Sequence, residues 1–386
     1  MCGSASLDPS SPGRPTRTVP VRDHGAGQGA TAEPGTRPCD TDPPTRRMSG
    51  ATAARPPSAP DPEKHDMPID LRTPPVPVSF EVYPPRSEAG FPALHETIRH
   101  LAAVDPRFIS VTYGAGGSTG GRSLELLTHI LRETHVEPLA HLTCVGNGYA
   151  GATSLIREFL DAGITSFLAL RGDPPAGSSE DDAFLGDLES AAQLVQLIDC
   201  VQAERAPYTE APVPGLPGAV RVAERPRVDI AVAAFPNGHP RARHASSDID
   251  ALLAKQAAGA TLAITQLFFH AEDYLGFVQR ARDAGVTIPI LPGIMPITSP
   301  ARLRRVLELT GEQLPAELAV ALDVEPTAEG QRAVGVTHAA QLAREVVEGG
   351  APGIHLYAFN NHDTVLEVLG EAGALPYAPR LPDPVH

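Results

Sequence analysis

An acidic side chain lies in the middle of a short apolar run. The run reads Val-Ser-Phe-Glu-Val-Tyr-Pro-Pro over Val78–Pro85, with Glu81 near its centre. In a strand, alternate residues point to opposite faces, so Glu81 shares a face with Ser79 and Tyr83 while the other face is apolar. A carboxylate in such a strand is costly unless it has partners or a chemical role. Taken alone, Glu81 is equally consistent with a satisfied buried acid or an exposed edge residue.

The same pattern, an apolar run that ends in polar or aromatic residues, recurs along the chain. The residues at these ends are Glu81, Thr112, Tyr113, His141, Arg171, Gly172, Asp173, Phe235, His239, Gln266, Tyr357 and Asn360. Each has a simpler explanation, and a histidine on a buried strand such as His141 is commonly a hydrogen-bonded core residue. No cluster has metal-ligand spacing, and no nucleophile-base pair is evident. The chemistry therefore depends on whether the fold brings these ends together.

The elements that position these residues are alternating strands and amphipathic helices. Strands are predicted at 78–83, 108–113, 139–145, 166–171, 229–235, 262–268, 288–291 and 353–359. Helices are predicted at 94–104, 123–133, 153–161, 191–203, 248–257, 271–284, 301–309 and 334–348. Gly163, Gly259 and Gly285 follow helical runs, as C-terminal caps do. Eight strands separated by helices favour a (β/α)8 TIM barrel, whose active site gathers at the C-terminal strand ends. An open doubly wound sheet is the alternative, although no GxGxxG follows the first strand.

Composition divides the 386 residues into parts. Residues 1–76 are rich in Pro, Gly, Ser, Thr and Arg, which predicts a disordered extension. The barrel is expected over 77–376, with a surface insertion at 204–227 and a tail at 377–386. The net charge of −15 argues against nucleic-acid or anionic-membrane partners. The four cysteines lack a disulfide framework, and no signal peptide or membrane span is apparent, so we expect a cytoplasmic protein.

Eight stretches together resemble the methylenetetrahydrofolate reductase family of flavin-dependent barrels, over about Val78 to Gly370. They are SFEVYPPR (79–86), SVTYGAGGST (110–119), AHLTCVG (140–146), LRGDPP (170–175), VAAFPNGHP (232–240), AITQLFF (263–269), PGIMP (292–296) and HLYAFN (355–360). Each stretch is a weak signal, but their order and their position at strand ends make the resemblance specific.

The resemblance implies a non-covalent FAD and a ping-pong reduction of 5,10-methylenetetrahydrofolate to 5-methyltetrahydrofolate by NAD(P)H, which feeds methionine synthesis. It places Glu81 as the general acid with a raised pKa, and Asp173 as the acid near the flavin ring. It places Gln266 and Asn360, with Glu81, at the folate. The positions that match flavin contacts are Thr112, Tyr113, Ala115, His141, Arg171, Gly172, Asp173, Phe235, His239, Ala242, Asp248 and Lys255.

One departure concerns the end of the last strand. Many family members carry an arginine directly after the asparagine of the last motif, and this chain carries Asn361. A flavin barrel that reduces another pterin or one-carbon carrier is therefore a rival reading, and a non-catalytic folate-binding barrel subunit is a second. NADH is expected as the donor in preference to NADPH, although neither leaves a motif. A homo-oligomer is expected because barrels of this family commonly associate.

Overall fold

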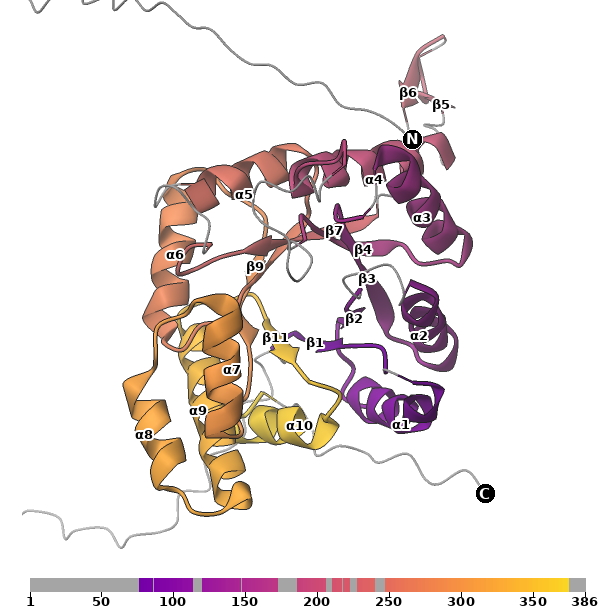
Figure 1. Cartoon of the computed structure of the whole chain (residues 1–386). Coiled ribbons are helices and arrows are strands. Elements are labelled where there is room, and N and C mark those ends of the chain that lie inside the picture. The colour runs from indigo at the N-terminus through magenta and orange to yellow at the C-terminus, as the bar shows by residue number, and fades with distance from the viewer. Residues whose placement is uncertain are drawn as a thin grey trace, which may run out of the picture. The chain divides into compact units, whose positions relative to one another are not determined.

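The molecule, a computed structural model, is described over residues 76–85, 87–113, 120–146, 148–172, 186–205, 210–216, 218–222, 228–239 and 247–374. Strands and helices alternate along this part of the chain, and the helices lie around the outside of the strands (Figure 1). The strands are β1 (Val78–Val82), β2 (Phe108–Val111), β3 (Glu137–Thr143), β4 (Ser166–Leu170), β5 (Glu210–Pro212), β6 (Val220–Val222), β7 (Asp229–Ala234), β8 (Leu262–Thr265), β9 (Ile290–Leu291), β10 (Gly293–Ile294) and β11 (Ile354–Tyr357). The helices are η1 (Glu88–Gly90), α1 (Phe91–Ala102), α2 (Gly120–Glu133), α3 (Tyr149–Asp161), α4 (Ala191–Arg205), α5 (Ser247–Ala257), α6 (Ala271–Asp283), α7 (Pro300–Thr310), α8 (Ala316–Val324), α9 (Ala328–Glu348) and α10 (His362–Glu371).

The main sheet is parallel and closes on itself. Its order is β10-β11-β1-β2-β3-β4-β7-β8-β9, and β9 and β10 are two pieces of one strand interrupted at Pro292. β9 pairs with β8 and β10 pairs with β11, so this broken strand joins the two edges. The predicted (β/α)8 barrel is confirmed, and the open-sheet alternative is wrong.

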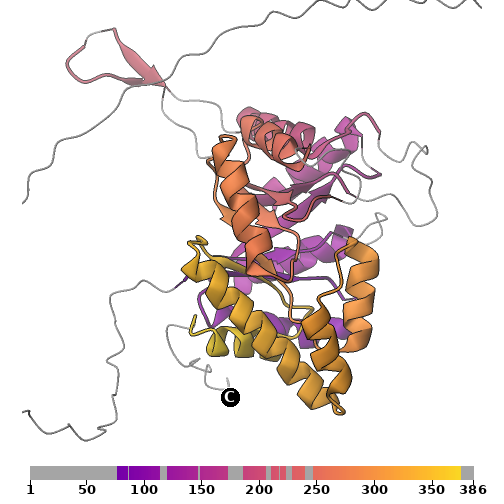
Figure 2. The same cartoon turned by 90° about the vertical axis from the view of Figure 1, so that its left-hand side faces the viewer.

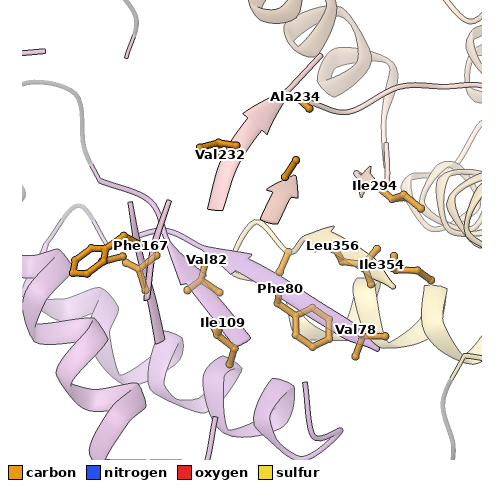
Figure 3. Packing of buried hydrophobic residues seen from close by; sticks show 14 of the residues in the cluster. Val78, Phe80, Val82, Ile109, Phe167, Val232, Ala234, Ile294, Ile354 and Leu356 are labelled. Atoms are coloured by element: carbon orange, nitrogen blue, oxygen red, sulfur yellow. The ribbon is translucent and has the colours of Figure 1, made fainter. Parts of the chain in front are cut away.

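Strand alternation separates two apolar layers. On β1, Val78, Phe80 and Val82 point outward and pack with the inner faces of the helices (Figure 3). A second cluster fills the barrel interior and comprises Phe108, Leu139, Leu168, Ala231, Leu262, Ile264 and Leu291. Because Ser79 and Glu81 lie on the opposite face of β1 from Phe80, they point into the barrel.

Glycines end several helices where they were predicted. Gly163, Gly259 and Gly285 have φ angles of 89°, 115° and 101°. Glycine adopts this left-handed region without the steric cost that a Cβ brings. Each turn sends the chain from a helix back toward the next strand, which keeps the strand ends at one rim.

α8 and α10 were not predicted. Leu318 and Leu322 of α8 are buried, whereas Val320 and Val324 are exposed, so apolar residues on both faces hide the helical period. α7, α8 and the long α9 lie together on the side that faces the viewer in Figure 2. The predicted insertion at 204–227 contains an antiparallel hairpin formed by β5 and β6. The predicted extension at 1–76, except Val76, and the tail, 377–386, fall outside the described residues.

Candidate functional site

A cavity of about 990 Å³ opens at the C-terminal ends of the barrel strands. Ten predicted site residues line it: Glu81, Thr112, His141, Arg171, Gly172, Phe235, His239, Asp248, Lys255 and Gln266. Ligand sites in proteins occupy roughly 300–1,000 Å³, so this volume suits a ligand at the large end of the range. The fold thus brings together residues that are far apart in the sequence.

Glu81 lies between two histidines. Its Oε1 accepts a hydrogen bond of 2.8 Å from the Thr112 hydroxyl. Its Oε2 is 3.7 Å from Nε2 of His141 and 3.8 Å from Nε2 of His355. Neither buried Nε2 atom has a hydrogen-bond partner among the described residues. The side chain of Glu81 itself is 21% exposed, toward the cavity.

The pKa of Glu81 differs from the sequence prediction. Burial raises it, but the charge interaction with His141, followed by the interactions with His355 and Thr112, outweighs burial. The pKa therefore lies below its usual value, and the predicted raised pKa is wrong for this arrangement. Burial also lowers the pKa of His141, against the opposing effect of Glu81.

His355 is a site residue that the sequence reasoning missed. It lies on β11 beside β1, where Ser79 is its register partner. Its Nδ1 is 2.9 Å from the Ser79 hydroxyl, which also donates to the Ile354 carbonyl at 3.3 Å. The signal was present, because alternation on the last strand places His355 and Tyr357 on one face.

A basic group lies in another part of the cavity wall. Lys255 Nζ donates to the Ala233 carbonyl at 2.8 Å and lies 6.0 Å from the centroid of the Phe235 ring. Burial lowers the pKa of Lys255 to about 8, and the nearby Asp248 carboxylate partly opposes this shift. Asp248 Oδ2 also accepts the backbone N–H of His239 at 3.0 Å. A mostly buried ammonium group here suits an anionic group of a ligand.

Gln266 lies directly after β8 and is fixed at the rim. Its backbone N–H donates to Ala234, and its Oε1 accepts the N–H of Leu267 at 2.9 Å. Within the described residues its amide nitrogen makes no hydrogen bond, so it can donate to a ligand in the cavity. Tyr357 stands nearby, and its hydroxyl donates to the Thr265 carbonyl at 2.9 Å.

Asn360 does not line the cavity. Its side chain accepts from the Tyr83 N–H at 3.0 Å and donates to the Tyr83 carbonyl at 2.8 Å. Phe359 and Asn360 have φ angles of 48° and 56°, an unusual backbone for residues with a Cβ, and such residues cost about 1–3 kcal/mol each. The bonds to Tyr83 hold this turn, and Phe359 lines the cavity as a result.

The remaining predicted residues have separate outcomes. Tyr113 is described but does not line the cavity. Ala115, Asp173 and Ala242 lie outside the described residues. One part of the wall could not be found from strand ends, because it comes from the end of α7 and the turn after it: Glu308, Leu309, Thr310 and Glu312.

No group of three or more His, Cys, Asp or Glu residues in the described part of the chain could hold a metal ion. No helix there is long and apolar enough to cross a membrane.

Comparison with known proteins supplies the family. The sequence matches the model of methylenetetrahydrofolate reductase over residues 70–373. It is 30% identical over 300 residues to the 5,10-methylenetetrahydrofolate reductase of Escherichia coli, covering 78% of this chain and 91% of that protein. It is 32% identical over 307 residues to the probable methylenetetrahydrofolate reductase (NADH) of Oryza sativa, covering 77% of this chain and 48% of that protein. The Arabidopsis thaliana methylenetetrahydrofolate reductase (NADH) 1 is 31% identical with the same coverage, so the chain spans about half the length of these plant relatives. The chain belongs to the methylenetetrahydrofolate reductase family.

Proposed function

We propose that the protein catalyses the FAD-dependent reduction of 5,10-methylenetetrahydrofolate to 5-methyltetrahydrofolate by NAD(P)H, in two successive half-reactions that feed methionine synthesis. The observation that carries the proposal is Glu81, a carboxyl group held between two histidines and facing a cavity that also contains Gln266. Family membership supports the reaction class. NADH is the expected donor, and the names of the two plant relatives support it.

The cavity residues fit FAD. Lys255 can neutralise a phosphate, while the rings of Phe235 and His239, 4.7 Å apart, offer surfaces for planar groups. Arg171 and Gly172 contribute from the end of β4, with Thr112 and His141 deeper in the barrel. When bound, FAD carries the hydride between the nicotinamide and the folate. Roles for Asp173, Ala115, Ala242 and Tyr113 in FAD binding remain part of the proposal.

The proton for the folate nitrogen comes from Glu81. The Ser79 hydroxyl donates to the Ile354 carbonyl and lies 2.9 Å from Nδ1 of His355, which orients the ring with Nε2 toward Glu81 Oε2. Glu81 takes up a proton when the folate covers it, and it donates that proton to the nitrogen whose protonation opens the five-membered ring. Gln266 orients the pterin through its amide.

Glu81→Gln tests the proposal. The variant keeps shape and the Thr112 contact but cannot donate an acidic proton, so folate reduction should fall by about 10²- to 10⁴-fold. Anaerobic stopped-flow absorbance should show that NADH still bleaches the bound flavin within roughly threefold of the wild-type rate.

Three results would reject the assignment. Purified full-length protein without a flavin spectrum would favour a non-catalytic folate-binding barrel. Flavin that NADH bleaches but methylenetetrahydrofolate does not restore would favour a different pterin or one-carbon substrate. Unchanged folate turnover in Glu81→Gln would remove Glu81 from the role of acid. A homo-oligomer and a cytoplasmic location remain predictions.

A further inference from the structure

An arginine with no acidic partner among the described residues stacks on Phe359, a residue of the cavity wall. Arg302 belongs to the first turn of α7, where its backbone N–H donates to the Ser299 cap at 3.2 Å. Its guanidinium carbon is 4.4 Å from the centroid of the Phe359 ring. The side chain is half-buried, and within the described residues no carboxylate lies within ion-pair distance of it.

The acids nearest in sequence already have partners. Glu308 pairs with Arg305 at 3.2 Å, and Glu312 accepts from the Asn237 amide at 2.8 Å. A half-buried guanidinium that makes no ion pair within the protein can bind an anionic group of a ligand. Stacking on Phe359 uses only the face of the guanidinium, so its N–H groups remain available in the plane, where they match a carboxylate.

The stacking surface is held rigidly. Phe359 lies in the left-handed turn with Asn360, whose side chain bonds both the N–H and the carbonyl of Tyr83. Thr97 Oγ1 also donates to the Asn360 carbonyl at 3.3 Å. Phe359 follows Tyr357 by two residues, at most about 7 Å along the chain. Tyr357 is the register partner of Glu81. Arg302 thus stacks on a cavity residue two positions after the register partner of Glu81.

The strand end itself offers no cation at this place. Asn361, which follows the turn, is the N-cap of α10, and its Oδ1 accepts the N–H of Thr364 at 3.1 Å. His362 is stacked on His100, with ring centroids 4.2 Å apart. Among the described residues, the cation that contacts Phe359 therefore comes from α7.

We propose that Arg302, stacked on Phe359, is a specificity residue that binds a carboxylate of the glutamate tail of the folate. This inference rests on the proposed function. A dinucleotide phosphate is the other oxyanion that could reach a guanidinium here, and the test separates the two sources.

The test compares ligands with and without the tail on the full-length protein. Arg302→Met keeps the apolar stem but removes the charge, Arg302→Lys keeps the charge without the planar fork, and Arg304→Met is the control on the same helix. Dissociation constants are measured by titration of the flavin absorbance for 5-methyltetrahydrofolate, 6-methyltetrahydropterin and NADH. Arg302→Met should weaken 5-methyltetrahydrofolate by about 10- to 100-fold, the loss expected for one charged hydrogen-bonded pair. Binding of the tail-less pterin and NADH should stay within roughly twofold, Arg302→Lys should be intermediate, and Arg304→Met should match the wild type.

Three outcomes overturn the inference. Equal weakening of 5-methyltetrahydrofolate and 6-methyltetrahydropterin would mean that the substitution disturbs the cavity. Weakening of NADH alone would assign Arg302 to a phosphate of the dinucleotide. Unchanged binding of all three ligands would mean that Arg302 contacts none of them. The wild-type protein separates these outcomes from failure of the proposed function, because failure to bind 5-methyltetrahydrofolate at all would reject the function before any variant is compared.

Discussion

Gly293→Ala should destabilise the barrel where the broken strand closes it. A Cβ at Gly293 would lie 2.3 Å from the Thr265 carbonyl oxygen and 2.9 Å from the Tyr357 ring and hydroxyl. Both distances are below any normal contact, and the first involves a backbone atom that cannot rotate away. The same carbonyl accepts the Tyr357 hydroxyl, while the Thr265 hydroxyl accepts the Gly293 N–H at 2.9 Å.

The cost has two parts. Forcing a methyl group into a packed region typically costs about 1–3 kcal/mol. Displacing the Tyr357 hydroxyl from Thr265 adds about 0.5–1.5 kcal/mol. The free energy of unfolding should therefore fall by roughly 2–4 kcal/mol, which lowers Tm by roughly 4–12 °C for a domain of this size.

Calorimetry or chemical denaturation of the wild type and two variants measures this effect. Gly121→Ala is the matched control, because a Cβ there meets no atom within 4 Å and the residue lies in α2. The control should be neutral or more stable by up to about 1 kcal/mol, since alanine favours helix over glycine. If Gly293→Ala is as stable as the control, β10 does not approach β8 as closely as described, and the closure of the sheet is wrong.

Two further predictions concern single side chains. Lys255→Met should weaken FAD binding but raise the stability of the FAD-free protein at pH 7, because the buried ammonium is destabilising below its folded pKa of about 8. In the wild type, the free energy of unfolding should rise with pH between about 8 and the unfolded pKa of 10.5. Chemical denaturation from pH 7 to 10 measures this, and a flat profile would contradict it. Asn361→Ala should lower the free energy of unfolding by about 0.5–2 kcal/mol, because α10 loses its N-cap. Asn361→Asp should keep most of the wild-type stability, since aspartate also caps helices. Equal stability of the two variants in urea denaturation would show that the cap contributes nothing.

The strands were readable from the sequence because their outer faces are buried against helices. In β1, the alternation of Val78, Phe80 and Val82 with polar residues identifies both the strand and the inward face that carries Glu81. The strand ends then give nine of the cavity residues, because a parallel barrel places all of them at one rim: Glu81, Thr112, His141, Arg171, Gly172, Phe235, His239, Gln266 and Tyr357. Local periodicity was sufficient for these features.

Features that depend on side chains meeting across the barrel were not readable. The direction of the pKa shift at Glu81 depends on His141 from β3 and His355 from β11, and no local pattern indicates that both Nε2 atoms face one carboxylate. The role of Asn361 as a helix cap was missed for a related reason, since α10 was not predicted. Arg302 stacks on Phe359 of the cavity wall, a contact between a helix and a strained turn.

The lowered pKa of Glu81 leads to a prediction about protons. An ionised Glu81 cannot donate a proton, so the protein must take one up before the folate ring opens. A ligand that covers the exposed fifth of the side chain removes water from the carboxylate, and this desolvation raises its pKa.

Binding of 5-methyltetrahydrofolate near neutral pH should therefore be accompanied by proton uptake. Isothermal titration calorimetry in buffers with different ionisation enthalpies counts the protons, and Glu81→Gln is the control that should take up fewer. Thermodynamic linkage then requires folate affinity to fall as pH rises, because the complex binds more protons than the free protein. Binding without uptake in the wild type, or equal uptake in Glu81→Gln, would mean that a group other than Glu81 supplies the proton for ring opening.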